Sequence, residues 1–165
     1  MKNLVLRKFK MEDATDMFNN WLGDEEVAKY MLYPLYNSIE DVEQNGMKFF
    51  VDNDEVYAIE YENEVVGSFT YNFNKKHNFV QIGFLLGTKF QNKKIMTNTL
   101  QYFLNKAKNE NVNLIIAEVM ENNIASSNLL EKKGFNLDGI IRKKYKDRYG
   151  VYQNIKVYTY LINEN

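Results

Sequence analysis

The chain has no cysteine and, among its 165 residues, only one histidine and one proline. Without cysteine there are no disulfides, thiolate nucleophiles or thiolate metal sites, and His77 alone cannot form a histidine cluster for zinc. A Ser/His/Asp triad could be built only around His77. Because His77 lies in a polar turn, we interpret it as a solvated residue. We therefore expect no metal site.

A surplus of charge of one sign is also missing. The 21 basic residues nearly cancel the 22 acidic ones, and the formal net charge of −1 lacks the positive field that nucleic-acid binding usually requires. Residues 1–10 alternate Leu and Val with charges, unlike a signal peptide, and no apolar run reaches roughly 18 residues. We expect neither nucleic acid nor a membrane as partner, and cytoplasmic residence by default.

The composition does provide enough apolar material for one folded core. Hydrophobic residues make up 45% and charged residues 26% of the chain, a balance that excludes intrinsic disorder. We find no internal repeat and no linker rich in proline or serine. The sequence therefore predicts a single domain over residues 1–165.

The first third of the chain predicts a strand followed by helices. Residues 4–9 alternate, whereas the apolar residues of 14–22 recur at helical spacing. A second helix is expected over Glu25–Leu32, because the residue before a proline is pushed out of the helical region. Ser38 has the character of an N-cap for a further helix over residues 39–50.

The rest of the chain alternates between strand and helix patterns. Strands are expected at Val56–Tyr61, Val65–Phe73, Phe79–Leu86, Leu114–Val119, from Phe135 onward, and at Tyr152–Ile162. Helices are expected from Lys94 to Ala107 and from Asn123 to Lys133. A helix before the apolar run Leu114–Val119 indicates a parallel crossover. The pattern predicts an α+β domain with a mixed sheet of about seven strands.

A basic segment lies near the C-terminus. It consists of Arg142, Lys143, Lys144, Lys146 and Arg148. Tyr145 and Asp147 interrupt it, and it is either a solvated loop or a nucleic-acid site. The near-zero net charge favours the solvated loop.

The most specific motif is Asn123–Phe135, which reads Asn, Ala-Ser, Leu, Glu-Lys and Gly-Phe at fixed spacing. With the order of elements, it resembles the GNAT superfamily of N-acetyltransferases, in the branch of ribosomal-protein N-terminal acetyltransferases. The resemblance extends from the opening Leu-Arg-Lys-Phe-x-x-Glu-Asp-Ala to the final Tyr-x-Tyr-Leu. It implies a mostly antiparallel sheet with about four helices, splayed in the middle to admit acetyl-CoA as co-substrate.

The resemblance also implies where acetyl-CoA is held. Backbone N–H groups around Phe84, Leu85 and Leu86 would hold the pantetheine and the acetyl carbonyl, and Asn123 would contact the pantetheine arm. A helix N-terminus suits a phosphate. The diphosphate would therefore contact Gln91, Asn92, Lys93, Lys94, Ile95, Met96 and Thr97.

Two residues of that loop depart from the family, which favours glycine where this chain has Asn92 and Lys94. If these positions need a positive φ, each non-glycine residue costs about 1 to 2 kcal/mol. A lysine bonded to a phosphate could return about 1.5 to 3 kcal/mol. The alternative is that Lys93 and Lys94 are exposed residues of a loop that no longer holds a phosphate.

A further departure concerns the base. Many members of this branch have a glutamate where this chain has Gln81, and glutamine cannot accept a proton at neutral pH. At pH 7 about one amine in 10³ is neutral for a pKa near 10.4, against about one in ten for an α-amine. We therefore expect an α-amine or another low-pKa amine as acceptor. Glu118 is the best replacement base, or else a charged residue at a strand end.

The remaining roles also follow from the resemblance. A tyrosine often protonates the leaving thiolate, but that position is Leu130, so Ser126 is the candidate acid. From its position in the last strand, and not from the resemblance, Tyr158 is a candidate for lining the acceptor pocket, as are Tyr30, Tyr33 and Tyr36 near Pro34. Most of the 12 tyrosines and 11 phenylalanines must belong to the core. The amine would attack the acetyl carbon directly, and no metal is required.

Other readings remain open. The departures at Gln81, Lys94 and Leu130 allow a catalytically weakened domain that binds acetyl-CoA as a sensor or partner. An interaction domain without a cofactor is a third reading. The chain is expected to be a monomer or a homodimer, since an exposed last strand offers an edge that a second copy could cover.

Overall fold

The computed structural model describes residues 3–32 and 35–162, so the predicted substrate residue Tyr33 lies outside the described residues. The chain divides into two compact units. The first contains the described residues up to Thr70 together with Phe84–Thr99, and the second contains Tyr71–Gly83 together with the described residues from Leu100 onward.

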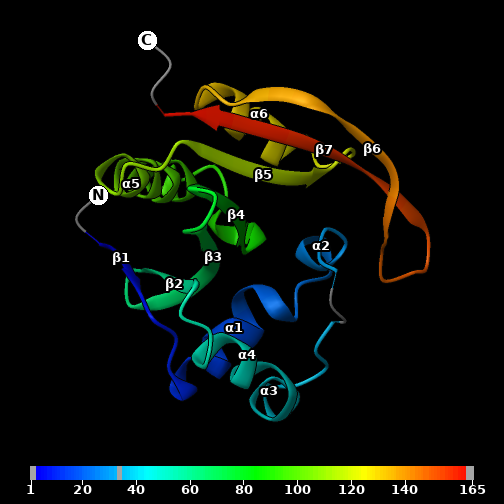
Figure 1. The fold of residues 1–165 in the computed structure, drawn as a ribbon. Coiled ribbons are helices and arrows are strands. Elements are labelled where there is room, and N and C mark those ends of the chain that lie inside the picture. Colours follow the sequence, from blue (N-terminus) through cyan, green and yellow to red (C-terminus); the bar gives the residue numbers. More distant parts are fainter. Residues whose placement is uncertain (1–2, 33–34, 163–165) are drawn as a thin grey trace. The chain divides into compact units, whose positions relative to one another are not determined.

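A seven-stranded sheet has the strand order β1-β2-β3-β4-β5-β7-β6 (Figure 1). Its strands are β1 Leu4–Arg7, β2 Val56–Tyr61, β3 Glu64–Asn74, β4 Phe79–Leu86, β5 Leu114–Met120, β6 Asn136–Lys146 and β7 Tyr152–Leu161. The β4–β5 pair is parallel, whereas the β1–β2, β2–β3, β5–β7 and β6–β7 pairs are antiparallel. The predicted mixed sheet, meander and parallel crossover are confirmed.

The helices are α1 Ala14–Met17, α2 Glu25–Ala28, α3 Ile39–Asp41, α4 Met47–Val51, α5 Ile95–Asn109 and α6 Ile124–Lys132. Ser38 caps α3 by accepting a bond from the Asp41 N–H at 3.1 Å, as predicted. The helix expected over Glu25–Leu32 is shorter. The N–H groups of Tyr30 and Met31 bond to the carbonyls three residues earlier, which tightens the chain and ends the α-helix at Ala28.

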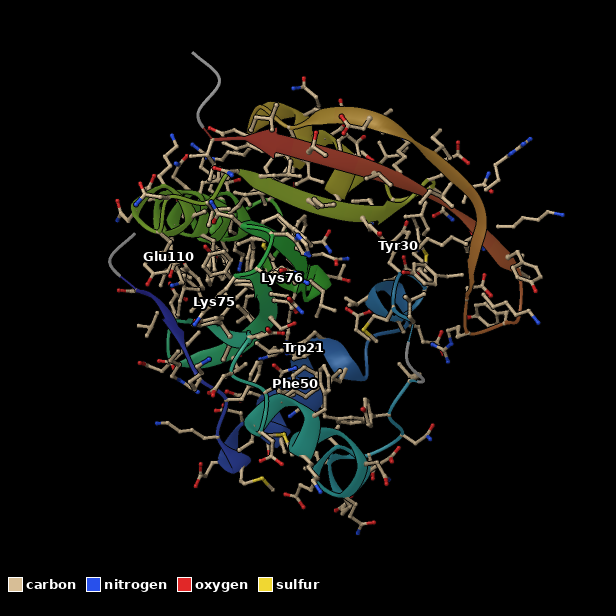
Figure 2. All side chains as sticks on the ribbon, viewed as in Figure 1. Trp21, Tyr30, Phe50, Lys75, Lys76 and Glu110 are labelled. Carbon is tan, nitrogen blue, oxygen red and sulfur yellow. The ribbon has the colours of Figure 1, made fainter. Side chains whose placement is uncertain are left out.

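The first unit has an aromatic core. Trp21 is fully buried, and its ring lies 5.5 Å from that of Phe50 at nearly a right angle (Figure 2). Such edge-to-face pairs are favourable beyond the area they bury. Residues 18–22 and 42–46 each form a π-helical turn, which places Trp21 and Val42 in this core.

One ion pair explains part of the opening motif. Arg7, at the end of β1, donates two bonds of 2.8 Å to the carboxylate of Asp13 and one of 2.6 Å to Glu60. Asp13 is buried, and these carboxylates raise the pKa of Arg7. The arginine and the aspartate of the motif therefore join the first strand to the turn that starts the helices.

The second unit ends in a long hairpin of β6 and β7, drawn in orange and red in Figure 1. β5 pairs with β7 only up to Met120, opposite Ile155, and the hairpin continues beyond that point. Here two predictions are wrong. The last strand is not an edge, because β7 lies between β5 and β6, and Arg142–Lys146 belongs to strand β6 rather than to a loop.

The described residues contain no helix that is both long and apolar enough to cross a membrane.

Candidate functional site

The loop before α5 has an unusual backbone. Asn92 and Lys94 both have φ of +61°, in the left-handed region that glycine prefers. Gln91 anchors the start of this loop, because its side-chain Nε2 donates to the carbonyl of Leu86 at 3.4 Å. The loop thus has the left-handed backbone that glycine prefers, although Asn92 and Lys94 stand at these positions.

Helix α5 begins directly after this loop. The carbonyl of Lys94 accepts the N–H of Asn98 at 3.0 Å, which is the first bond of the helix. The side chains of Ile95 and Met96 are buried and anchor the first turn, whereas residues 91–94 are exposed. The first N–H groups of a helix have no partner within it, so this end can receive an anion.

The last residues of β4 pack closely against β3. The ring of Phe84 stacks on that of Phe69, with centroids 6.1 Å apart. A Cβ on Gly67 would lie 2.3 Å from the carbonyl oxygen of Leu85, so only glycine fits there. This close approach fixes the backbone of the segment that was predicted to hold the pantetheine.

The first unit also has an open hollow of about 570 Å³. It is lined by Phe18, Asn19, Asn20, Gly23, Asp24, Thr88 and Lys89. The carboxylate of Asp24 bridges two backbones, accepting the N–H of Glu26 at 2.9 Å and that of Thr88 at 3.3 Å. The sequence alone does not reveal this role of Asp24, because the contact with Thr88 joins residues 64 positions apart.

In the second unit, Asn123 is the N-cap of α6, and its side-chain oxygen accepts the N–H of Ser126 at 3.2 Å. The amide NH₂ of Asn123 remains a potential donor. Ser126 is partly exposed in the first turn of the helix, whereas Leu130 is completely buried. The position at which the family often has a tyrosine thus belongs to the core.

Gln81 and Glu118 lie on one face of neighbouring strands. Gln81 pairs with Ile116 in the parallel ladder, and Glu118 follows two residues later along β5. Alternate residues of a strand share a face. Gln81 is exposed and Glu118 is partly buried, so an amide and a carboxylate lie on the same face of two neighbouring strands.

The carboxylate of Glu118 already has two partners. Lys144 forms an ion pair with it at 2.5 Å, and the hydroxyl of Tyr145 donates to it at 3.2 Å. Burial lowers the pKa of Lys144, but the hydrogen bonds and charges of Glu118 and Tyr145 together outweigh this, so the pKa is raised overall. Lys144 therefore stays charged and holds the Glu118 carboxylate across the intervening strand β7.

A bulge in β6 makes this contact possible. Ile141 pairs with Ile155 and Tyr145 with Gln153, so three residues of β6 face Asn154 alone. Lys143 has φ of +54°, and its N–H donates to the Asn154 side chain at 3.0 Å. Bulges commonly redirect side chains beside functional sites. Lys144 and Tyr145 were not predicted as site residues, because strand periodicity does not reveal a bulge.

Tyr158, in strand β7, is completely buried. Its hydroxyl donates to Glu131 of α6 at 2.8 Å. Burial raises the pKa of Tyr158, the Ser127 hydroxyl opposes this, and Glu131 adds to it. The side chain joins β7 to α6, and its predicted contact with the acceptor stays a prediction.

The structure therefore brings the predicted residues together in three groups. Phe84–Leu86 and Gln91–Thr97 lie in the first unit, Asn123 and Ser126 in the first turn of α6, and Gln81 and Glu118 on one face of β4 and β5. In the part of the chain that the structure describes, no three carboxylate or histidine side chains are grouped as a metal site.

The acetyltransferase (GNAT) domain model matches residues 3–136, most of the chain, and the protein belongs to this family. The expectation from the residues is thus confirmed at the level of the family. No curated protein matches the chain.

Several solved structures share the fold. The ribosomal L7/L12 alpha-N-protein acetyltransferase RimL has 20% identity and a TM-score of 0.84 over 98% of this chain and 92% of its own. The microcin C7 self-immunity acetyltransferase MccE, in complex with acetyl-CoA and AMP, has 22% identity and a TM-score of 0.82 over 98% and 94%. Spermidine N-acetyltransferase from Vibrio cholerae has 21% identity and a TM-score of 0.78 over 98% and 96%.

Proposed function

We propose that this protein transfers an acetyl group from acetyl-CoA to the α-amine at the N-terminus of a polypeptide. The observation that carries the proposal is the left-handed backbone of Asn92 and Lys94 directly before α5. Strained conformations of this kind persist only where the surrounding structure enforces them, and they cluster at functional sites. MccE, whose structure contains acetyl-CoA, and RimL, named for α-N-protein acetylation, share the fold.

Each segment has its own role toward acetyl-CoA, which supplies the activated acetyl group. The N–H groups at the start of α5 and the ammonium of Lys94 bind the diphosphate. The amide NH₂ of Asn123 donates to the pantetheine arm. The backbone around Phe84–Leu86 orients the acetyl carbonyl, and a preorganised donor to the developing oxyanion is worth about 2.7 to 4 kcal/mol.

The acceptor class follows from Gln81 and Glu118. Gln81 can orient an amine but cannot remove its proton, and Glu118 is shared between Lys144 and Tyr145. Such a site favours an amine that is already partly neutral. At pH 7 roughly one α-amine in ten is neutral, against about one lysine side chain in 10³.

The chemical step is a direct transfer. The neutral amine forms a bond to the acetyl carbon as the carbon–sulfur bond breaks, and the nitrogen loses a proton to water or to Glu118. Ser126 donates a hydrogen bond, directly or through water, to the leaving thiolate, which then takes up a proton from water. The products are an N-acetylated polypeptide and the free thiol of coenzyme A.

The test is release of that thiol with a panel of acceptors. A peptide with a free α-amine should support turnover at least about tenfold better in kcat/KM than spermidine, because of the difference in neutral fraction. An otherwise identical peptide with a blocked α-amine should be inactive. Comparable turnover of spermidine and the free peptide would contradict the proposal.

A second candidate is an acetyl-CoA-binding sensor without turnover. Burial of Leu130 at the family's tyrosine position and engagement of Glu118 by Lys144 both favour it. Acetyl-CoA would then raise the melting temperature, but no acceptor in the panel would release the thiol.

A further inference from the structure

Two consecutive residues of β6 hold the carboxylate of Glu118 at both of its oxygens. The ammonium of Lys144 lies 2.5 Å from Oε1, and the hydroxyl of Tyr145 donates to Oε2 at 3.2 Å. These two partners also contact each other, because the Lys144 ammonium lies over the ring of Tyr145, 4.8 Å from its centroid. The direction of the carboxylate is therefore fixed by two side chains that support each other.

A regular strand would not supply this pair of contacts. Successive side chains of a regular strand point to opposite faces, which would place Lys144 and Tyr145 on different sides of the sheet. The bulge of β6, between the residues that pair with Ile155 and Gln153, removes this restriction. The bulge includes Lys143 in the left-handed region, a conformation that persists only where the surrounding structure enforces it. The distorted backbone and the two contacts with the carboxylate thus occur together.

The surroundings of the ion pair make it suited to fixing a side chain. Glu118 lies opposite Val157 of β7, whose apolar side chain offers the carboxylate no hydrogen bond. The side chains of Lys144 and Glu118 are only 25% and 21% exposed. A partly buried pair is screened by salt and water much less than an exposed one. The contact with Lys144 therefore holds Glu118 more firmly than an ion pair on an open surface would.

The held carboxylate keeps the capacity to accept a proton. An ionised carboxylate has about four lone-pair sites, and Lys144 and Tyr145 use two of those of Glu118. Gln81, on the same face of the neighbouring strand, has an amide that can orient an amine but cannot take its proton. A general base must lie within hydrogen-bond reach of the proton, directly or through one water. A carboxylate that is held in one direction can meet this geometric condition.

We infer that Lys144 and Tyr145 are positioning residues, which hold the carboxylate of Glu118 so that it accepts the proton of the acceptor amine, directly or through one water. The inference rests on the proposed function and adds two residues of β6 to its chemical step. The proton leaves the nitrogen as the nitrogen–carbon bond forms, and it passes from Glu118 to water. The leaving thiolate takes up its own proton from water.

The test is a double-mutant cycle on kcat, measured with acetyl-CoA and a peptide that has a free α-amine. Lys144→Met removes the ammonium and should lower kcat about tenfold, and Tyr145→Phe about threefold, because a displaced base loses part of its effect. In the Glu118→Gln background, Lys144→Met should change kcat by less than about twofold, since Lys144 acts through Glu118. Lys144→Arg should keep kcat within about threefold of wild type, because a guanidinium also pairs with a carboxylate.

The matched control is Lys146→Met, which removes an exposed ammonium from the same strand. Lys146 lies over the ring of Tyr152, so the kcat of this variant should stay within about twofold of wild type. If wild type turned over no α-amine peptide, the proposed function and this inference would both fail. If wild type did turn such a peptide over, an unchanged kcat in Lys144→Met would refute only the positioning role. Equal fractional losses from Lys144→Met in the wild-type and Glu118→Gln backgrounds would refute it too, because a contact that serves folding alone lowers kcat in both.

Discussion

At Asn92 and Lys94 the side chain departs from the glycine that the family favours, while the backbone retains the left-handed conformation typical of glycine. A left-handed conformation costs a non-glycine residue about 1 to 2 kcal/mol, and Asn tolerates it better than most. Both residues nevertheless have φ of +61°. The surrounding bonds, such as that of Gln91 to Leu86, therefore hold the loop in this shape.

Two substitutions separate the charge of Lys94 from its backbone strain. Lys94→Ala removes the ammonium and keeps the strain, whereas Lys94→Gly removes both. We expect each to weaken acetyl-CoA binding about tenfold, measured by calorimetry. Only the glycine variant should gain stability, by up to about 1 kcal/mol in urea unfolding. Unchanged affinity in Lys94→Ala would show that Lys94 is merely exposed.

Glu118 is the other residue whose role a substitution can decide. If it removes the amine proton, Glu118→Gln should lower kcat about 100-fold, a typical loss for a general base. Glu121→Gln is the matched control, because its carboxylate bonds to Asn154 rather than to a lysine. A Glu118→Gln variant with nearly full kcat would leave the Lys144 ion pair as a structural contact.

At the scale of elements, Glu110 ties the end of α5 to β3. Tyr71 donates to its carboxylate at 2.6 Å, and Lys106 pairs with it on the same helix. Figure 2 shows Lys75 near this carboxylate. Burial raises the pKa of Glu110, but the bonds from Lys106 and Tyr71 outweigh it, and Lys75 adds to them, so the pKa lies below its usual 4.5.

The lowered pKa of Glu110 determines how the free energy of unfolding depends on pH. A carboxylate whose pKa is lower in the folded state than in the unfolded state stabilises the folded state at pH values above its unfolded pKa. This stabilisation is lost as the pH falls through its folded pKa. We expect Glu110→Gln to reduce the free energy of unfolding at neutral pH and to make its decline in acid shallower. Urea unfolding between about pH 6 and pH 3 measures this, with the exposed Glu43→Gln as control. If the free energy of unfolding declined with falling pH equally steeply in wild type and in Glu110→Gln, the prediction would be contradicted.

Most elements were predictable because one face of each is buried. The alternation of Val56–Tyr61, the apolar run of β5 and the cap at Ser38 each have a local cause, and each is confirmed. β6 was harder, since nearly all of it is exposed and a bulge breaks its register. The basic residues of β6 were therefore predicted to lie in a loop.

For the whole molecule, the clearest prediction concerns stability with acetyl-CoA. At about 100 times its Kd, a ligand that binds only the folded state adds about 2.7 kcal/mol. For a chain of this size that raises the melting temperature by about 5 to 10 °C. Thermal unfolding with acetyl-CoA, and with acetate alone as control, measures it. No shift with acetyl-CoA would refute cofactor binding and every function proposed above.

The sequence by itself determined the family, the order of the elements and the departures at Gln81, Lys94 and Leu130. These depend on local periodicity and on the spacing of Asn123–Phe135. Only the tertiary structure placed Lys144 on Glu118 and β7 inside the sheet. The reason is that strand neighbours and the reach of a bulged side chain are set by pairing between residues distant in the chain, which leaves no local pattern.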